Sequence, residues 1–91
     1  PRKRSHSRPD HPLARWRKVH GVTQDALATA TRLSKGMIAH IENYRHIPIR
    51  DSLERLRTYT GLPTDAFVRG ERFLAEYPDF PYSQHPPAAE P

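Results

Sequence analysis

The sequence predicts an all-α protein, a compact five-helix domain between a flexible basic N-terminal arm and a proline-rich C-terminal tail. Apolar residues recur at three- and four-residue steps through the centre of the chain, which is the spacing of a buried helix face. Residues that favour helix ends flank these segments. Ten prolines lie mostly near the two ends, and hydrophobic residues make up only 35% of the chain. We therefore divide the chain into an arm (1–10), a helical domain (11–70) and a short helix with an aromatic, proline-rich tail (71–91).

The first helix is expected from about His11 to His20. Asp10 precedes it as a candidate N-cap, Pro12 is tolerated in its first turn, and Gly21 is a natural stop. The expected buried face of this helix consists of Leu13, Trp16 and Val19.

Two short helices joined by a tight turn are expected between Thr23 and Asn43. Thr23 caps a helix over 24–31, and Ser34 caps another over 35–43. Apolar stripes on both helices let them pack together. These apolar residues are Leu27, Ala28, Leu33, Ile38 and Ile41. The second helix keeps one face free, and that face carries Lys35, Gly36, Met37 and His40. A free helical face in a basic protein favours insertion into the major groove of DNA.

The fourth helix follows a connector in which Pro48 prevents helix propagation. It opens at Ile49 or Asp51 and ends at Gly61. Its apolar positions are Leu53, Leu56 and either Tyr59 or Thr60.

A fifth, short helix is expected after Thr64, which is its candidate N-cap. Phe67 and Val68 lie on one side of this helix, and Gly70 breaks it before a final turn or two over 71–77. The remainder of the tail is expected to be irregular.

The charge is unevenly distributed along the chain. Residues 1–12 carry a net charge of +3, residues 13–70 carry ten basic and five acidic side chains, and residues 71–91 carry a net charge of −3. A basic arm and a basic centre point to a polyanionic partner. The alternative is that a basic composition only keeps a small protein soluble.

The sequence excludes several classes of function. It contains no cysteine, so a disulfide framework, a thiolate metal site and a cysteine nucleophile are ruled out. It has six histidines, but none pair at the i, i+4 spacing of two ligands on one helix. We expect no metal, no cofactor and no enzymatic activity. Without an apolar run long enough for a membrane span or signal peptide, we expect a cytoplasmic protein.

The order of certain residues over 13–69 carries a resemblance to a known family. These residues are Arg17, Gly21, Thr23, Gln24, Leu27, Ala28, Ser34, Ile38, Ile41, Glu42, Pro48, Leu53, Leu56, Gly61 and Phe67. Their order resembles the phage repressor/Cro helix-turn-helix family, whose DNA-binding domain has five helices. The resemblance covers about three-fifths of the chain and extends over all five expected helices.

The resemblance implies that the third helix lies in the major groove. Positions that would meet base edges are Lys35, Gly36, Met37 and His40. Positions that would contact phosphates are Arg17, Gln24, Asn43, Arg45 and Arg50. Arg17 and Glu42 match the family's arginine–glutamate pair, which ties the first helix to the third. The chain departs from the family at Arg32 and Tyr44, where glycine is common, so Arg32 is expected in a left-handed conformation.

The arm and the tail each have two interpretations. The arm cations, Arg2, Lys3, Arg4 and Arg8, could lie along a DNA groove or could belong to a solvated terminus. The apolar residues near the tail could form a dimer interface, as the last helices do in the family, or could complete the core of the monomer. These residues are Phe67, Val68, Phe73, Leu74 and Tyr77.

We therefore expect a sequence-specific regulator of transcription, repressor-like, that binds double-stranded DNA as a homodimer. A different class remains open, in which the same fold is a protein-interaction module, such as an antitoxin or an adaptor of the transcription machinery. The proline-rich aromatic tail favours that alternative, because such a segment can order against a partner. Sequence-indifferent coating of DNA is a third alternative.

Overall fold

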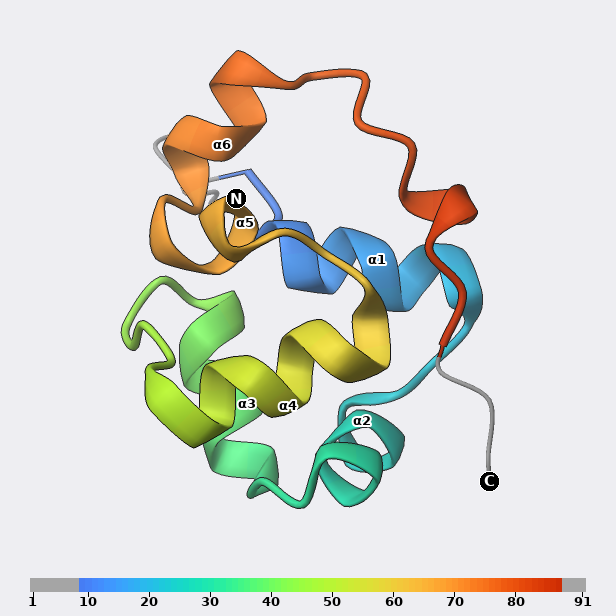
Figure 1. Ribbon diagram of the computed structural model, residues 1–91, viewed down its shortest axis with the longest axis vertical. Helices are drawn as coiled ribbons and strands as arrows, with labels where there is room; N and C mark the ends of the chain where they lie inside the picture. The colour runs from blue at the N-terminus through green and yellow to red at the C-terminus, as the bar shows by residue number, and fades with distance from the viewer. Residues whose placement is uncertain (1–8, 88–91) are drawn as a thin grey trace, which may run out of the picture.

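The computed structural model describes residues 9–87 and is all-helical over this range, as expected (Figure 1). It contains six α-helices and a short 3₁₀ turn, and the described residues include no strand. The elements are α1 (Pro12–His20), α2 (Gln24–Thr31), α3 (Lys35–Glu42), α4 (Arg50–Thr60), α5 (Thr64–Val68), α6 (Glu71–Glu76) and η1 (Tyr82–Gln84). No helix in this part of the chain is long and apolar enough to span a bilayer.

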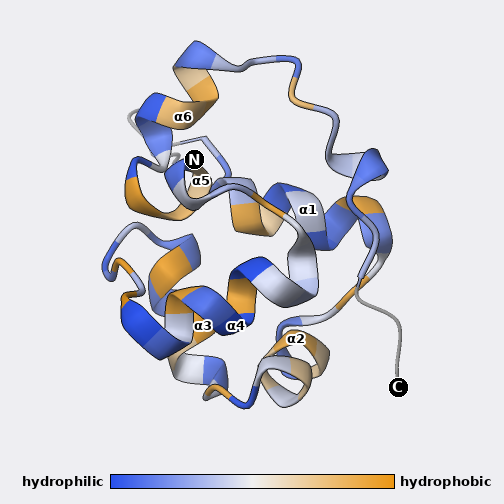
Figure 2. Ribbon diagram, in the orientation of Figure 1, coloured by the Kyte–Doolittle hydropathy of each residue, from blue (hydrophilic) through white to orange (hydrophobic). Residues whose placement is uncertain are grey.

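The core forms among α1 to α6, and Tyr82 of η1 also belongs to it. The helix α2 packs against α3 and α4, while α1 packs against α3 and α5. Apolar and polar segments alternate along the ribbon of these helices, so each buries only one side (Figure 2). Of the residues expected in the core, Leu53 is only partly buried and packs against the cluster. Leu33 is likewise only partly buried. The fully buried residues of the expected core include Leu13, Trp16, Leu27, Ile38, Ile41 and Leu56.

One expected core residue of α1 is exposed. The buried arc of α1 includes Leu13 and Trp16, and the tail covers the neighbouring His20, whose Nε2 lies 3.0 Å from the Tyr82 carbonyl oxygen. Val19 lies at the edge of this arc and is 52% exposed. The expectation that Val19 belongs to the core is therefore wrong.

The predicted caps are right at four helix ends and wrong at two. Thr23 and Ser34 accept backbone N–H bonds at the starts of α2 and α3, and the left-handed Gly21 and Gly61 end α1 and α4. Thr64 is not a cap. The extended Pro63 before it occupies the cap position, so Thr64 is the first helical residue of α5.

The other wrong cap is Asp10, because His11 caps α1 instead. A residue that precedes proline is held in an extended conformation, and His11 has φ −58° and ψ 148° before Pro12. The Nδ1 atom of His11 accepts a hydrogen bond of 3.0 Å from the Leu13 N–H. Asp10 instead binds the Lys18 ammonium at 2.8 Å, and this hydrogen bond lowers the pKa of its carboxyl group.

The buried cap makes stability depend on pH. Burial lowers the pKa of His11 from 6.5 to about 4, so the unfolded chain binds more protons between these values. Stability is therefore full above pH 6.5 and falls as the pH drops toward 4, by up to about 3 kcal/mol. His11→Asn keeps a cap that does not titrate. Between pH 6.5 and 4, we expect urea unfolding to show a smaller loss of unfolding free energy for this variant than for the native chain. Equal losses would contradict the assignment of the pH dependence to His11.

The tail folds back on its own chain. The indole N–H of Trp16 donates to the His85 carbonyl oxygen, and the Phe80 and His85 rings stack with their centroids 5.0 Å apart. Tyr82 is buried in the same region. The tail is irregular around η1, as expected, but up to residue 87 it is part of the folded unit.

Candidate nucleic-acid interface

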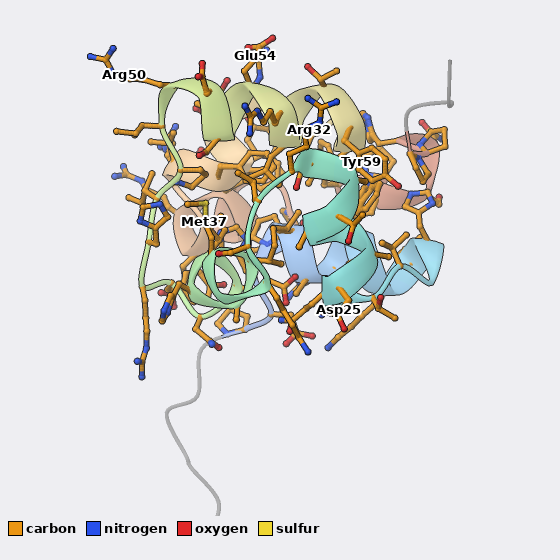
Figure 3. The ribbon with its side chains drawn as sticks, turned by 90° about the horizontal axis from the view of Figure 1, so that it is seen from below. Asp25, Arg32, Met37, Arg50, Glu54 and Tyr59 are labelled. Atoms are coloured by element: carbon orange, nitrogen blue, oxygen red, sulfur yellow. The ribbon has the colours of Figure 1, made fainter. Side chains whose placement is uncertain are left out.

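The helix α3 has one buried and one exposed face. Ile38 and Ile41 anchor the buried face in the core, and the Ser34 hydroxyl accepts the Met37 N–H at 3.0 Å at the start of the helix. On the other face, Lys35, Gly36 and His40 are exposed. Met37 lies among neighbouring side chains and packs partly against the core (Figure 3). Of the four predicted base-reading residues, three are thus exposed.

A shallow hollow of about 540 Å³ lies along this face. Its lining includes three of the predicted base-reading residues and one predicted phosphate contact, and the full set is Ser34, Gly36, Met37, His40, Arg45 and His46. The sequence does not mark His46 as a lining residue, because a histidine in an irregular connector has no periodicity that would identify it. The hollow places apolar, neutral polar and cationic groups side by side.

Gly36 lines this hollow without filling it. A Cβ atom built on Gly36 would meet only the Ser34 hydroxyl oxygen, at 3.9 Å, and would otherwise project into open space. The backbone of Gly36 also lacks the positive φ that would require glycine. Nothing in the described part of the chain therefore accounts for a helix-weakening glycine at this position.

A partly buried cluster of three side chains fixes the orientation of α3. The Glu42 carboxylate, whose side chain is 7% exposed, accepts two hydrogen bonds from Arg17, at 2.8 Å and 3.0 Å. It also accepts a hydrogen bond of 3.0 Å from the Gln24 amide. The bond to Glu42 raises the pKa of Arg17, so the guanidinium stays charged. This cluster joins α1, the start of α2 and the end of α3.

The cluster also limits two of the predicted phosphate contacts. The Arg17 side chain is 17% exposed and uses its Nε, Nη1 and Nη2 atoms within the protein, with Nη1 donating to the Val22 carbonyl oxygen at 3.2 Å. Gln24 commits one amide N–H to Glu42. Both residues mainly position α3, and only their remaining N–H groups are free to face a phosphate.

The other predicted phosphate contacts lie in or beside the connector between α3 and α4. Asn43, Arg45 and Arg50 are all exposed, and Arg50 points away from the body of the protein (Figure 3). Lys35, at the opposite end of α3, lies 3.7 Å from the Asp25 carboxylate, and both side chains are largely exposed. This ion pair is weak in water and yields readily to a competing anion.

Two bulky residues adopt the left-handed conformation on either side of α3. Arg32, at the end of α2, has φ +61°, as expected, and Tyr44, two residues after α3, has φ +62°. Arg50 also has a positive φ, +50°, which the sequence did not predict. Each such residue costs about 1–2 kcal/mol relative to the right-handed conformation, and such strain tends to gather at functional sites.

Most of the residues predicted for a dimer interface lie inside a single chain. Phe67, Phe73 and Leu74 are buried in the monomer, whereas Val68 is 43% and Tyr77 is 50% exposed. Val68 lines a hollow of about 210 Å³ together with Ile47, which is itself 52% exposed. The exposed apolar surface near α5 is thus formed by Ile47 and Val68.

The arm residues Arg2, Lys3, Arg4 and Arg8 lie outside the described residues. Within those residues, no group of three histidine or acidic side chains is placed to hold a metal ion. Comparisons with protein family models, with curated proteins and with solved structures find no match to this chain.

Proposed function

We propose that the chain is a sequence-specific, double-stranded DNA-binding regulator of transcription. In this proposal α2 and α3 form a helix-turn-helix unit, and α3 enters the major groove. The observation that carries the proposal is the exposed face of α3, which Gly36 leaves open and which Lys35 and Arg45 flank with positive charge. The Arg17–Glu42–Gln24 cluster supports it, because a groove-reading helix must be held at a fixed angle.

Affinity and sequence choice come from different groups in this mechanism. Arg45, Arg50 and the arm neutralise phosphates, so the logarithm of the binding constant falls by about 0.9 per contact for each unit of log salt concentration. Base readout rests on Lys35 and His40. Lysine suits the O6 and N7 acceptors of guanine, so we expect a guanine opposite Lys35. Lys35 exchanges Asp25 for the DNA when it binds.

A second copy completes the site on an inverted repeat. We assign the pairing about a two-fold axis to Ile47 and Val68, two exposed apolar residues that line the same hollow. Their exposed area is far below the roughly 1,200 Å² that a stable interface buries. The proposed dimer therefore forms on DNA, where two adjacent half-sites raise the local concentration of the chain.

The Val68→Asp variant tests this dimer. Val68 is partly exposed, so the variant folds, but a buried aspartate opposes pairing. We expect unchanged affinity for a single half-site and a loss of cooperative binding to the inverted repeat, measured by native mass spectrometry of the complexes. Val19→Asp, at an exposed site on α1, is the control. One copy per inverted repeat for the native chain would contradict the dimer.

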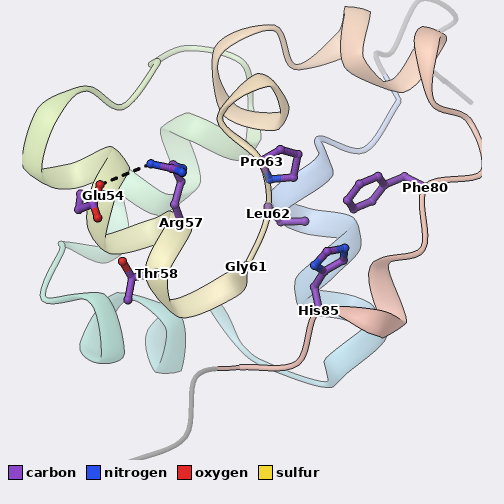
Figure 4. Close-up of a pocket in the computed structure, with 8 residues that line it drawn as sticks. All are labelled: Glu54, Arg57, Thr58, Gly61, Leu62, Pro63, Phe80 and His85. Atoms are coloured by element: carbon purple, nitrogen blue, oxygen red, sulfur yellow. Dashed lines mark hydrogen bonds and ion pairs between the residues drawn. The ribbon is translucent and has the colours of Figure 1, made fainter.

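The interaction module is the second candidate, and one observation favours it. A hollow of about 360 Å³ lies between α4 and the tail. Phe80 and His85 face Leu62 and Pro63 across it, with the Glu54–Arg57 ion pair farther along α4 (Figure 4). However, the tail already packs on its own chain, which removes the apolar surface that a partner would bury.

Selection from random duplex DNA at about 150 mM salt tests the proposal. An inverted repeat with half-sites about 34 Å apart supports the dimeric regulator. Retained DNA without a motif supports sequence-indifferent binding, and no retained DNA favours the interaction module. Lys35→Ala with His40→Ala is the matched variant, because it removes both base-reading side chains from an exposed face and leaves the core unchanged.

A further inference from the structure

Two neighbouring residues in the hollow along α3 carry no strong hydrogen-bonding side chain. Gly36 and Met37 line the hollow together with Ser34 and His40. Gly36 has no side chain, and the thioether of Met37 is only a weak acceptor. The Ser34 hydroxyl already accepts the Met37 N–H at 3.0 Å, as the cap of the helix. Gly36 and Met37 therefore offer a base edge apolar contact in place of side-chain hydrogen bonds.

The space beside Gly36 is large enough for one methyl group. Beyond the adjacent residues and the backbone of the helix, a Cβ atom built on Gly36 would meet only the Ser34 hydroxyl oxygen, at 3.9 Å. This distance is an ordinary van der Waals contact. Glycine weakens the helix here, and its backbone has no positive φ that would require it. The open space therefore does not serve the fold of the free protein.

Met37 forms an apolar wall next to this space. It is partly buried and packs against the core cluster (Figure 3). Core packing holds such a side chain in place before a partner arrives, which favours a defined contact. An unbranched, polarisable thioether also adjusts to the shape of a small apolar group. The hollow thus combines an open position with an adaptable apolar neighbour.

We propose that Gly36 and Met37 form a contact site for the methyl group on C5 of a pyrimidine base. This inference rests on the proposed function and adds to it a determinant of sequence choice that uses no hydrogen bond. In the major groove, the C5 methyl group of thymine is the apolar feature by which a protein recognises a base. The open space beside Gly36 accommodates a group of this size.

Two bases can supply this methyl group. Thymine carries the O4 acceptor beside it, whereas 5-methylcytosine carries the N4 amino donor. The proposed contact depends only on the methyl group that they share. Methyl-bearing and methyl-free versions of each base therefore test the contact and identify its source.

A methyl scan of the half-site recovered by selection is the first part of the experiment. Each thymine is replaced in turn by uracil, which lacks the methyl group, and each cytosine by 5-methylcytosine, which adds one. We expect one position per half-site at which the methyl-bearing duplex binds the native chain about fourfold more tightly, the factor for burying one methyl group. A difference between thymine and uracil identifies thymine as the source, and one between 5-methylcytosine and cytosine identifies 5-methylcytosine.

The Gly36→Ala variant, titrated with the same two duplexes, is the second part. Its added methyl group would occupy the space that the DNA methyl group takes in the native complex. We expect it to weaken binding to the methyl-bearing duplex at least about fivefold and to change binding to the methyl-free duplex less than about twofold. Any effect of the methyl group on the duplex itself is common to both proteins and cancels in the comparison.

Thr58→Ala is the matched control, because it adds no group to the hollow along α3 and lies at an exposed position of α4. It should keep the native preference for the methyl-bearing duplex. Gly36→Ala introduces no clash, so the variant folds, and urea unfolding checks this.

Each other outcome overturns a defined part of the inference. Equal binding of methyl-bearing and methyl-free duplexes at every position of the half-site overturns the methyl contact and leaves the proposed function standing. A methyl preference that Gly36→Ala retains unchanged overturns the assignment to Gly36 and Met37. If selection recovers no motif, the proposed function is overturned, and this inference with it.

Discussion

Glu42→Ala is expected to lower the free energy of unfolding by about 3 kcal/mol and to weaken DNA binding more than any other single change in α3. The carboxylate is the common acceptor for Arg17 and Gln24, and its removal leaves a largely buried guanidinium without its partner. It also releases α3 from α1, so the angle of the helix is no longer fixed. Urea unfolding measures the first effect, and titration of the selected duplex at low temperature measures the second.

The double variant Arg17→Met with Glu42→Leu separates the two effects. Replacing a buried ion pair by apolar side chains of similar size often restores stability, so this variant should unfold at a higher urea concentration than Glu42→Ala. DNA affinity should stay low, because the charge of Arg17 beside the proposed phosphate path is lost. Recovery of DNA affinity together with stability would show that Arg17 acts only within the fold.

The sequence predicts the elements of this fold well because the relevant signals are local. The Thr23 and Ser34 caps and the Gly21 stop depend on a few neighbouring residues, and the structure has them as expected. The caps at α1 and α5 were wrong for a shared reason. Pro12 holds the preceding residue, His11, in an extended conformation, and Pro63 is itself extended. An extended residue directly before a helix takes the cap position, and this overrides the preference of Asp10 or Thr64 for that position.

The residues that the sequence could not place depend on long-range contacts. The helical spacing of Phe67, Phe73 and Leu74 is compatible with either an exterior or an interior position. They become part of the core because α5 and α6 pack on α1 and on each other, and the Phe80 ring of the tail also meets Phe73. Similarly, Gln24 was expected at a phosphate, because nothing in its neighbourhood indicates that Glu42 lies within 3.0 Å of its amide. The spacing of residues along one helix predicts which face is apolar, but it does not predict which part of the protein or which partner packs against that face.

The Gly36→Ala variant should stabilise the free protein and weaken its DNA complex. Alanine in a helix is favoured over glycine by about 0.5–1 kcal/mol, and the open space at Gly36 accepts a methyl group without a clash. In the proposed DNA complex, the same methyl group would project into the hollow where we place a base edge. Overpacking of a close contact costs about 1–3 kcal/mol, which corresponds to a loss of affinity of roughly fivefold to 150-fold.

A gain in folding stability together with a loss of DNA affinity distinguishes a local effect at Gly36 from a general change in the protein. Thr58→Ala provides the comparison, because it also raises helix propensity but lies on α4 beside the tail, where it lines the hollow of Figure 4. This control should gain a few tenths of a kcal/mol in stability and bind DNA unchanged. If Gly36→Ala gained stability and also kept its affinity, the backbone of α3 would not approach the bases at Gly36. Sequence choice would then rest on Lys35 and His40 alone.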